Sequence, residues 1–185
     1  MAYSGFGTSG QVQTSNGVGT LASYQPGGGG GSSVGFSATL TASPTNLTGD
    51  GTVVTVPFDT LLYDTNSGFD TSTFTYTIPV SGNYAFSVSF LMNNLSAGQT
   101  FTSLTVPLDA PGGSLQMQLA VSNPFASGGL FVGTNSYTTS ASWVMDMTAG
   151  ETVIVQWAVI GGTKTVGLQG FSSPTYFANF SGVKI

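Results

Sequence analysis

Few side chains in this sequence could perform chemistry. The chain has seven acidic residues and two lysines, Lys164 and Lys184, and it has no arginine, histidine or cysteine. A Ser-His-Asp triad, a Cys-His dyad and a zinc set all need residue types that are missing. The pairs Asp59 with Asp64 and Asp146 with Glu151 could in principle hydrolyse a glycoside. We expect these carboxylates to be turn and strand-end residues, so the sequence predicts a protein that is not an enzyme.

One acidic segment has the pattern of a cation-binding loop. Residues 64–70 place Asp64, Asn66 and Asp70 around Gly68, and such alternate oxygen donors are typical of calcium loops. The segment lacks the distal bidentate glutamate of an EF-hand, and an Asx-rich turn between two strands is the simpler interpretation. Calcium at Asp64, Asn66 and Asp70 is therefore a weak hypothesis, and we expect no other cofactor.

The composition limits the class of partner. Only 5% of the 185 residues are charged, 40% are hydrophobic, and the formal net charge is −5. So few cations cannot neutralise a phosphate backbone or an anionic bilayer surface, which argues against nucleic-acid and membrane binding. The surface must be built largely from Ser, Thr, Asn, Gln and Gly.

A period of two runs through the chain from Val34 onward and predicts half-buried β-strands. The alternation is strongest around residues 73–80, 84–90, 115–121 and 153–159, and Gly-rich turns separate these segments. We therefore predict an all-β fold, a two-sheet antiparallel jelly roll of about ten strands. Ile154, Ala158 and Ile160 add apolar groups to the second face of one strand. We expect that face to be covered by a partner subunit in a trimer, or by loops of the same chain.

Several stretches of residues 34–185 resemble the globular head of complement component one-q. They are Thr48–Thr52, Val56–Thr60, Phe74, Pro79–Phe86, Met147–Val153 and the terminal Phe180-Ser181-Gly182-Val183-Lys184-Ile185. In that family a strand ending in Pro-x-x-Gly precedes a Tyr/Phe-x-Phe strand, as Pro79–Gly82 precedes Tyr84 and Phe86 here. The resemblance implies a ten-stranded jelly roll of the tumour-necrosis-factor type. It also implies a compact homotrimer that acts by binding.

Residues 1–33 differ in composition and are predicted to form an irregular, Gly-rich N-terminal arm and linker. Gly27–Gly31 is an unbroken glycine run, which resists ordering. The segment Gly7-Thr8-Ser9-Gly10-Gln11-Val12 resembles a short segment recurrent in phage tail-fibre and virion-fibre proteins, although Gln13 stands where leucine is usual. We expect these residues to anchor the chain to a particle. Met1–Gly5 have no signal-peptide character, which favours folding in a cytoplasm.

These observations favour a virion structural protein: a capsid decoration protein or short fibre head at the virion surface, self-associated as a homotrimer and held by residues 1–33. One alternative is a subunit of a bacterial surface or extracellular filament assembled by strand exchange. Another is a carbohydrate-binding adhesin, for which Tyr137 and Tyr176 are the candidate glycan contacts because tyrosine offers stacking area and a hydroxyl.

Overall fold

A computed structural model of the chain describes most of residues 34–185 and two strands of the arm. The described residues are 11–14, 23–26, 34–96, 98–99, 101–109, 116–122, 136–170 and 178–185, and for 11–14, 23–26, 101–109 and 116–122 only the backbone is considered. Every regular element in this part of the chain is a β-strand, and every strand pairing is antiparallel. The all-β prediction is confirmed.

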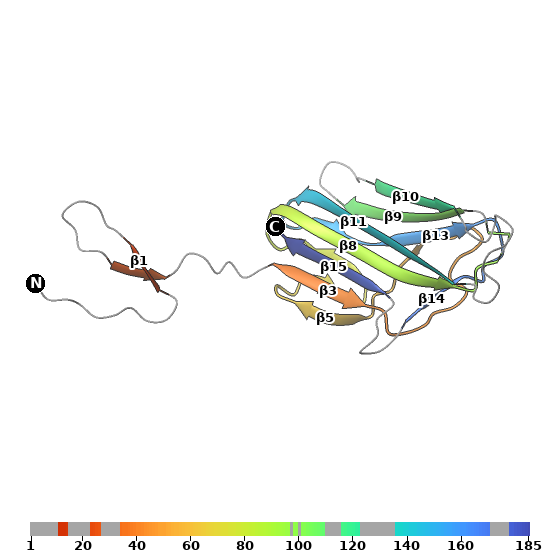
Figure 1. Ribbon diagram of the computed structural model, residues 1–185, viewed down its shortest axis with the longest axis horizontal. Helices are drawn as coiled ribbons and strands as arrows, with labels where there is room; N and C mark the ends of the chain where they lie inside the picture. Colours follow the sequence, from red (N-terminus) through yellow and green to blue (C-terminus); the bar gives the residue numbers. More distant parts are fainter. Residues whose placement is uncertain are drawn as a thin grey trace, which may run out of the picture. The chain divides into compact units, whose positions relative to one another are not determined.

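The chain divides into two compact units, Met1–Ser33 and Val34–Ile185. In the first unit, β1 (Gln11–Thr14) pairs with β2 (Ser23–Pro26). The second unit contains the remaining strands, which form two sheets (Figure 1).

The first sheet of the larger unit carries the candidate functional surface on its outer face. Its order is β11 (Tyr137–Met147), β8 (Gly82–Asn93), β15 (Asn179–Lys184), β3 (Gly35–Thr39) and β5 (Thr60–Asp64). The short strand β14 (Gly167–Gln169) also pairs with β8. Because neighbours in this sheet are far apart in sequence, the chain crosses repeatedly between sheets, as a jelly roll requires.

The second sheet faces the first across the core. Its order is β4 (Val54–Thr55), β13 (Gln156–Ile160), β9 (Phe101–Asp109), β12 (Thr152–Val153), β7 (Thr75–Thr77) and β6 (Phe69–Asp70), with β10 (Gln116–Ser122) paired to β9. The strand predicted over 153–159 is therefore two strands, and Ile154 lies in the break between them. The break separates β12, which pairs with β7 and β9, from β13, which pairs with β4 and β9.

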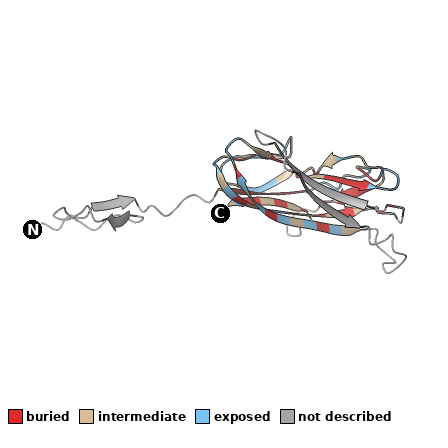
Figure 2. Ribbon diagram, turned by 90° about the horizontal axis from the view of Figure 1, so that it is seen from above, coloured by how far each residue is buried: buried red, intermediate tan, exposed pale blue. Residues whose placement is uncertain are grey.

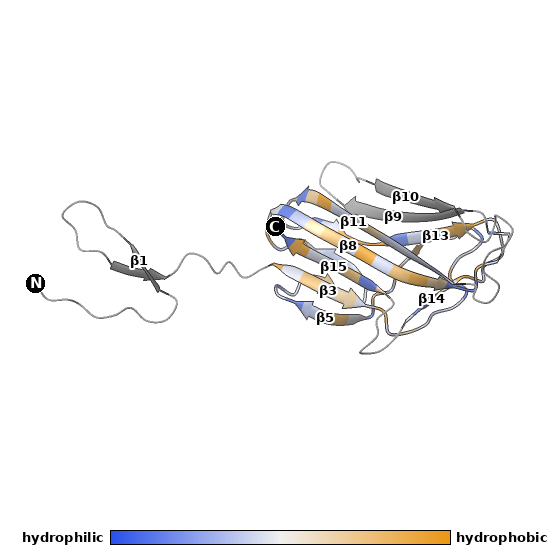
Figure 3. Ribbon diagram, viewed as in Figure 1, coloured by the Kyte–Doolittle hydropathy of each residue, from blue (hydrophilic) through white to orange (hydrophobic). Residues whose placement is uncertain are grey.

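The core lies between the two sheets and is rich in aromatic rings. Along β8, buried side chains alternate with more exposed ones, and Figure 2 shows the change of burial along the strands of this sheet. Figure 3 shows that both hydrophobic and hydrophilic residues lie along β8. Phe36 of the first sheet stacks on Tyr76 of the second with ring centroids 4.0 Å apart, and Phe90 meets Trp157 at 5.7 Å. Phe180 is fully buried and lies close to four rings, those of Phe36, Phe58, Phe69 and Phe86.

Gly182 lets two of these rings approach the backbone of β15. A methyl group at this position would lie 2.7 Å from ring carbons of Phe86 and 2.8 Å from one of Phe36. Only glycine therefore fits between these rings without displacing them.

Candidate functional site

The outer face of the first sheet, away from the core, carries a transverse row of serines. In register, Ser142 of β11 lies opposite Ser87 of β8, Ser87 opposite Ser181 of β15, and Ser181 opposite Ser37 of β3. The hydroxyl of Ser142 donates to that of Ser87 at 3.2 Å, and the amide of Asn179 donates to that of Ser37 at 2.8 Å. Three of the four hydroxyls, those of Ser142, Ser87 and Ser37, therefore have a hydrogen-bond partner on the face itself.

The next row along the same strands is apolar. Val144 lies opposite Ala85, Ala85 opposite Val183, and Val183 opposite Gly35. Val144 is 61% exposed and Val183 is 38% exposed. Since Ala85 and Gly35 are small, this row adds apolar surface to the face without raising ridges across it.

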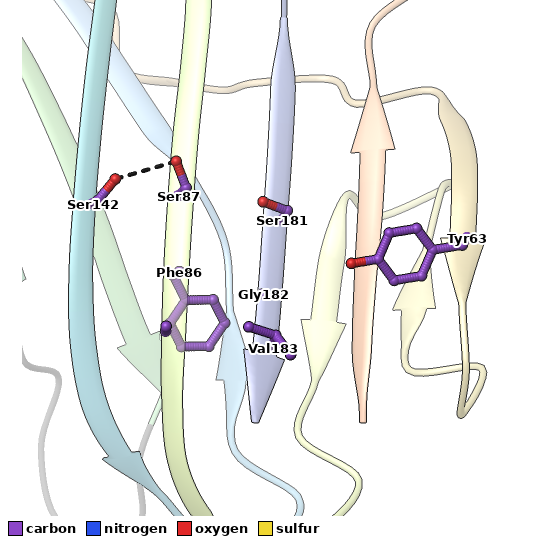
Figure 4. Close-up of a pocket in the computed structure, with 8 residues that line it drawn as sticks. Tyr63, Phe86, Ser87, Ser142, Ser181, Gly182 and Val183 are labelled. Atoms are coloured by element: carbon purple, nitrogen blue, oxygen red, sulfur yellow. Dashed lines mark hydrogen bonds between the residues drawn. The ribbon is translucent and has the colours of Figure 1, made fainter. Parts of the chain in front are cut away.

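Tyr63 closes one end of these rows and turns them into a groove. It comes from β5, pairs with Ser37, and extends its ring over β3 toward β15 (Figure 4). The groove has a volume of about 290 Å³ and is lined by eight residues: Tyr63, Ala85, Phe86, Ser87, Ser142, Ser181, Gly182 and Val183. We call this surface, the two rows together with Tyr63, the serine–valine face.

Strand β5 is fixed beside β3 by the carboxylate of Asp59. Its two oxygens accept the backbone amides of Thr41 at 2.8 Å and Ala42 at 2.9 Å, and one also accepts the hydroxyl of Thr60 at 3.0 Å. Partial burial raises the pKa of Asp59, but these hydrogen bonds outweigh it and hold the pKa below its ordinary value. Asp59, which could have been one of a catalytic pair, thus positions the strand that carries Tyr63.

The serine–valine face is almost free of charge. Among the outward-directed described residues of β11, β8, β15 and β3, the only charged one is Asp146, at the end of β11. The chain contains no histidine that could act as a general base for the serine hydroxyls. Such a surface can bind by shape, apolar contact and neutral hydrogen bonds.

The three residues predicted for a subunit interface are placed unequally. Ile160 is 44% exposed at the end of β13, whereas Ala158 is 2% exposed within the single chain. Ile154 is half-buried between β12 and β13. Of the three, Ile160 offers the most surface to a partner, and exposed Val53 precedes the neighbouring strand β4.

The candidate calcium loop is organised by its own hydrogen bonds. Asp64 accepts the backbone amides of Asn66 at 3.1 Å and Phe69 at 2.8 Å, and Asp70 accepts the amide and hydroxyl of Ser72 at 2.7 and 2.6 Å. These are Asx-type turns, the simpler of the two interpretations of this segment. In the part of the chain that the structure describes, no group of three or more acidic, histidine or cysteine residues could hold a metal ion. Calcium binding here stays a prediction.

The structure describes only some of the residues predicted to contact a glycan or a particle. Tyr137 begins β11 and packs half-buried against the core. Tyr176 and the stretch 7–10 lie outside the described residues, and Gln11 and Val12 belong to β1, of which only the backbone is considered. The glycan and anchoring roles of these residues therefore stay predictions.

Sequence reasoning did not single out the serine–valine face. The alternation in residues 84–90 pointed to the buried aromatic side, and the serines between were treated only as its polar complement. A signal was nevertheless present, because an exposed strand face in a soluble protein usually carries charged side chains. Here the alternate positions of 83–91, 138–146 and 179–183 hold Ser, Ala, Val and Asn with few charges.

Solved structures of other proteins share the fold of the larger unit. No family model and no curated protein matches the chain. Among solved structures, the globular domain of zebrafish complement 1qA is similar, with 17% identity and a TM-score of 0.53 over 82% of this chain and 97% of that one. Murine APRIL is also similar, with 11% identity and a TM-score of 0.57 over 83% of this chain and 99% of that one. The larger unit therefore has the jelly-roll fold of the complement-q and tumour-necrosis-factor type, as the sequence resemblance predicted.

In the described ranges there is no helix long and apolar enough to cross a bilayer.

Proposed function

We propose that this chain is a non-enzymatic structural or binding protein that assembles as a homotrimer through its serine–valine face. The observation that carries the proposal is the near absence of charge on a face that leaves Val144, Val183 and Tyr63 exposed. The fold adds support, since the family resemblance implies a homotrimer.

The chemistry of the face suits a protein contact. Removing charged groups from water is costly, whereas serine hydroxyls that already hydrogen-bond to their neighbours lose much less. Exposed valine and tyrosine contribute favourable burial of about 25 cal/mol per Å² of apolar surface. The small side chain of Ala85, which is only partly buried, lets a second backbone approach closely.

The surface around Ile160 is the rival site for the same assembly. Ile160, at the end of β13, and Val53, just before β4, are both exposed large apolar residues, and Ile160 belongs to the interface predicted at Ile154, Ala158 and Ile160. The two locations make different predictions for two single substitutions.

The test compares the Val183→Asp and Ile160→Asp variants of the full chain by light scattering. We expect a trimer for the wild type and for Ile160→Asp, and a monomer for Val183→Asp, because three uncompensated charges would enter one interface. The reverse pattern would place the interface on β13. A monomeric wild type would overturn the trimer proposal.

The finer proposal is a virion role at an extracellular or particle surface. The arm, residues 1–33, would attach the trimer to a capsid or fibre, and the resemblance of Gly7–Val12 to segments of fibre proteins supports this. Within that role, we propose a capsid decoration protein or a short fibre head. Cosedimentation of the full chain with particles, abolished by replacing 7–12 with Gly and Ser, is the expected result.

Two alternatives have distinct readouts. A filament subunit assembled by strand exchange would form open polymers at full length, which light scattering detects directly. A carbohydrate-binding adhesin would give a signal on a glycan array that Tyr137→Ala or Tyr176→Ala removes.

A further inference from the structure

Strand β5 forms a free edge of the first sheet and exposes three consecutive apolar side chains. It stands last in the strand order, and among the described strands it pairs only with β3. Leu61 is 39% exposed, Leu62 is 42% exposed and Tyr63 is 50% exposed. No other run of three exposed large apolar residues occurs among the residues whose burial is described.

Two of the usual protections against pairing with another chain, a lysine and a proline, are missing from this short, bulged edge. Edge strands are commonly guarded by lysine, proline or inward-pointing charge. The sequence of β5, Thr-Leu-Leu-Tyr-Asp, has neither lysine nor proline. Its one charge, Asp64, is directed into the following turn, where it accepts the amides of Asn66 and Phe69.

A register shift leaves Leu62 as the one of these three residues that lies opposite no residue of β3. Ser37 lies opposite Tyr63 and Ala38 opposite Leu61, so Leu62 has no partner residue on β3. This bulge increases the local twist, which limits any added strand to a short stretch.

We propose that the β5 edges of two copies pair antiparallel, centred on Leu62. In that register Leu61 of one copy lies opposite Tyr63 of the other, and Thr60 lies opposite Asp64. The sequence is thus self-complementary, with aliphatic–aromatic cross-strand pairs, which stabilise a sheet, and with no like charges opposed. The occupant is therefore a second copy of this chain, joined edge to edge.

The contact is too small to hold two single chains together strongly. A five-residue edge falls well below the roughly 1,200 Å² of buried surface that a stable complex needs. The inference therefore rests on the proposed homotrimer for its strength, because each trimer presents three such edges and their binding adds up. Pairing of the β5 edges links trimers into hexamers or extended arrays.

Sedimentation of the full chain over a hundredfold range of concentration tests this proposal. We expect trimers at low concentration and multiples of the trimer at high concentration. Leu62→Lys and Leu62→Pro should each raise the concentration of half-association at least tenfold, by adding an edge charge or removing a backbone donor. Val80→Lys is the matched control, since Val80 is 43% exposed and lies outside the strands.

The outcomes separate this inference from the trimer. Trimers at every concentration would overturn edge pairing and leave the trimer standing. Dimers of single chains, lost in Leu62→Lys but not in Val80→Lys, would support edge pairing and overturn the trimer. Larger species that persist in both Leu62 variants, each confirmed folded by its unfolding transition, would overturn edge pairing.

Discussion

The two faces of the first sheet are made by the same strands and differ in almost every physical property. The inner face of β8 and β15 presents Tyr84, Phe86 and Phe180, all buried in a cluster of stacked rings. The outer face presents Ser87 and Ser181 at the neighbouring positions. Stability is therefore concentrated on one side of each strand, while the other side can be used for association.

Small residues have different roles on the two faces of the sheet. On the inner side Gly182 is required by the close approach of Phe86 and Phe36. On the outer side the serines lie in one transverse row, and their short side chains leave the surface flat. Substitutions on the two sides should therefore differ in what they change, and the following tests run from the largest expected effect to the smallest.

The strongest contrast is between Phe180→Ala and Ser181→Ala, two adjacent residues of β15. Phe180→Ala should lower the free energy of unfolding by about 3–5 kcal/mol, because it leaves a cavity among four rings. Ser181→Ala should change it by less than about 0.5 kcal/mol. Urea unfolding at one fixed protein concentration measures both. Equal losses would show that the outer face contributes to folding as much as the core.

A smaller effect should distinguish two tyrosines in the core, Tyr84 of the first sheet and Tyr76 of the second. The hydroxyl of Tyr84 donates to the carbonyl of Val80 at 2.7 Å, whereas that of Tyr76 is buried without a partner. Burial raises the pKa of both phenols, so both are neutral near pH 7. Tyr84→Phe should cost about 1 kcal/mol, and Tyr76→Phe should be neutral or stabilising. Thermal unfolding of the two variants checks this, and an equal loss in Tyr76→Phe would reveal an unseen partner for its hydroxyl.

The smallest effect concerns the one carboxylate that fixes β5 beside the outer face. Because the pKa of Asp59 is lowered in the folded state, its stabilisation is present above the ordinary pKa of about 3.9 and is lost as the pH falls below it. Asp59→Asn should therefore flatten the fall in thermal stability between about pH 5 and pH 2. Parallel curves for the two proteins would mean that Asp59 does not contribute to acid sensitivity.

The sequence predicted the inner face well because that face depends on local pattern. Alternation in residues 84–90 places Tyr84, Phe86 and Phe90 in the core, as observed. Local pattern was less reliable near Phe74, which was expected inside a strand and instead has a φ of 59°. That backbone conformation belongs to turns, so the strand is only Thr75–Thr77.

The outer face could not be read from the sequence in the same way. Its rows depend on which distant strands are neighbours, such as β15 beside β3, and on a register that local alternation does not determine. Strand β5 escaped prediction because Leu61, Leu62 and Tyr63 are consecutive, which breaks the period of two. The sequence analysis predicted a subunit contact at Ile154, Ala158 and Ile160 because these residues are apolar, whereas the Ser-rich strand face has the composition of ordinary solvated surface.

Asp146 is the one charged residue among the outward-directed described residues of β11, β8, β15 and β3, and this has a consequence for the proposed trimer. Contacts made by opposite charges weaken as salt accumulates, because mobile ions screen them within about 10 Å at 0.1 M. A face built from hydroxyls and methyl groups has almost nothing to screen. Assembly through it should therefore be nearly indifferent to salinity, from dilute fresh water to concentrated brine.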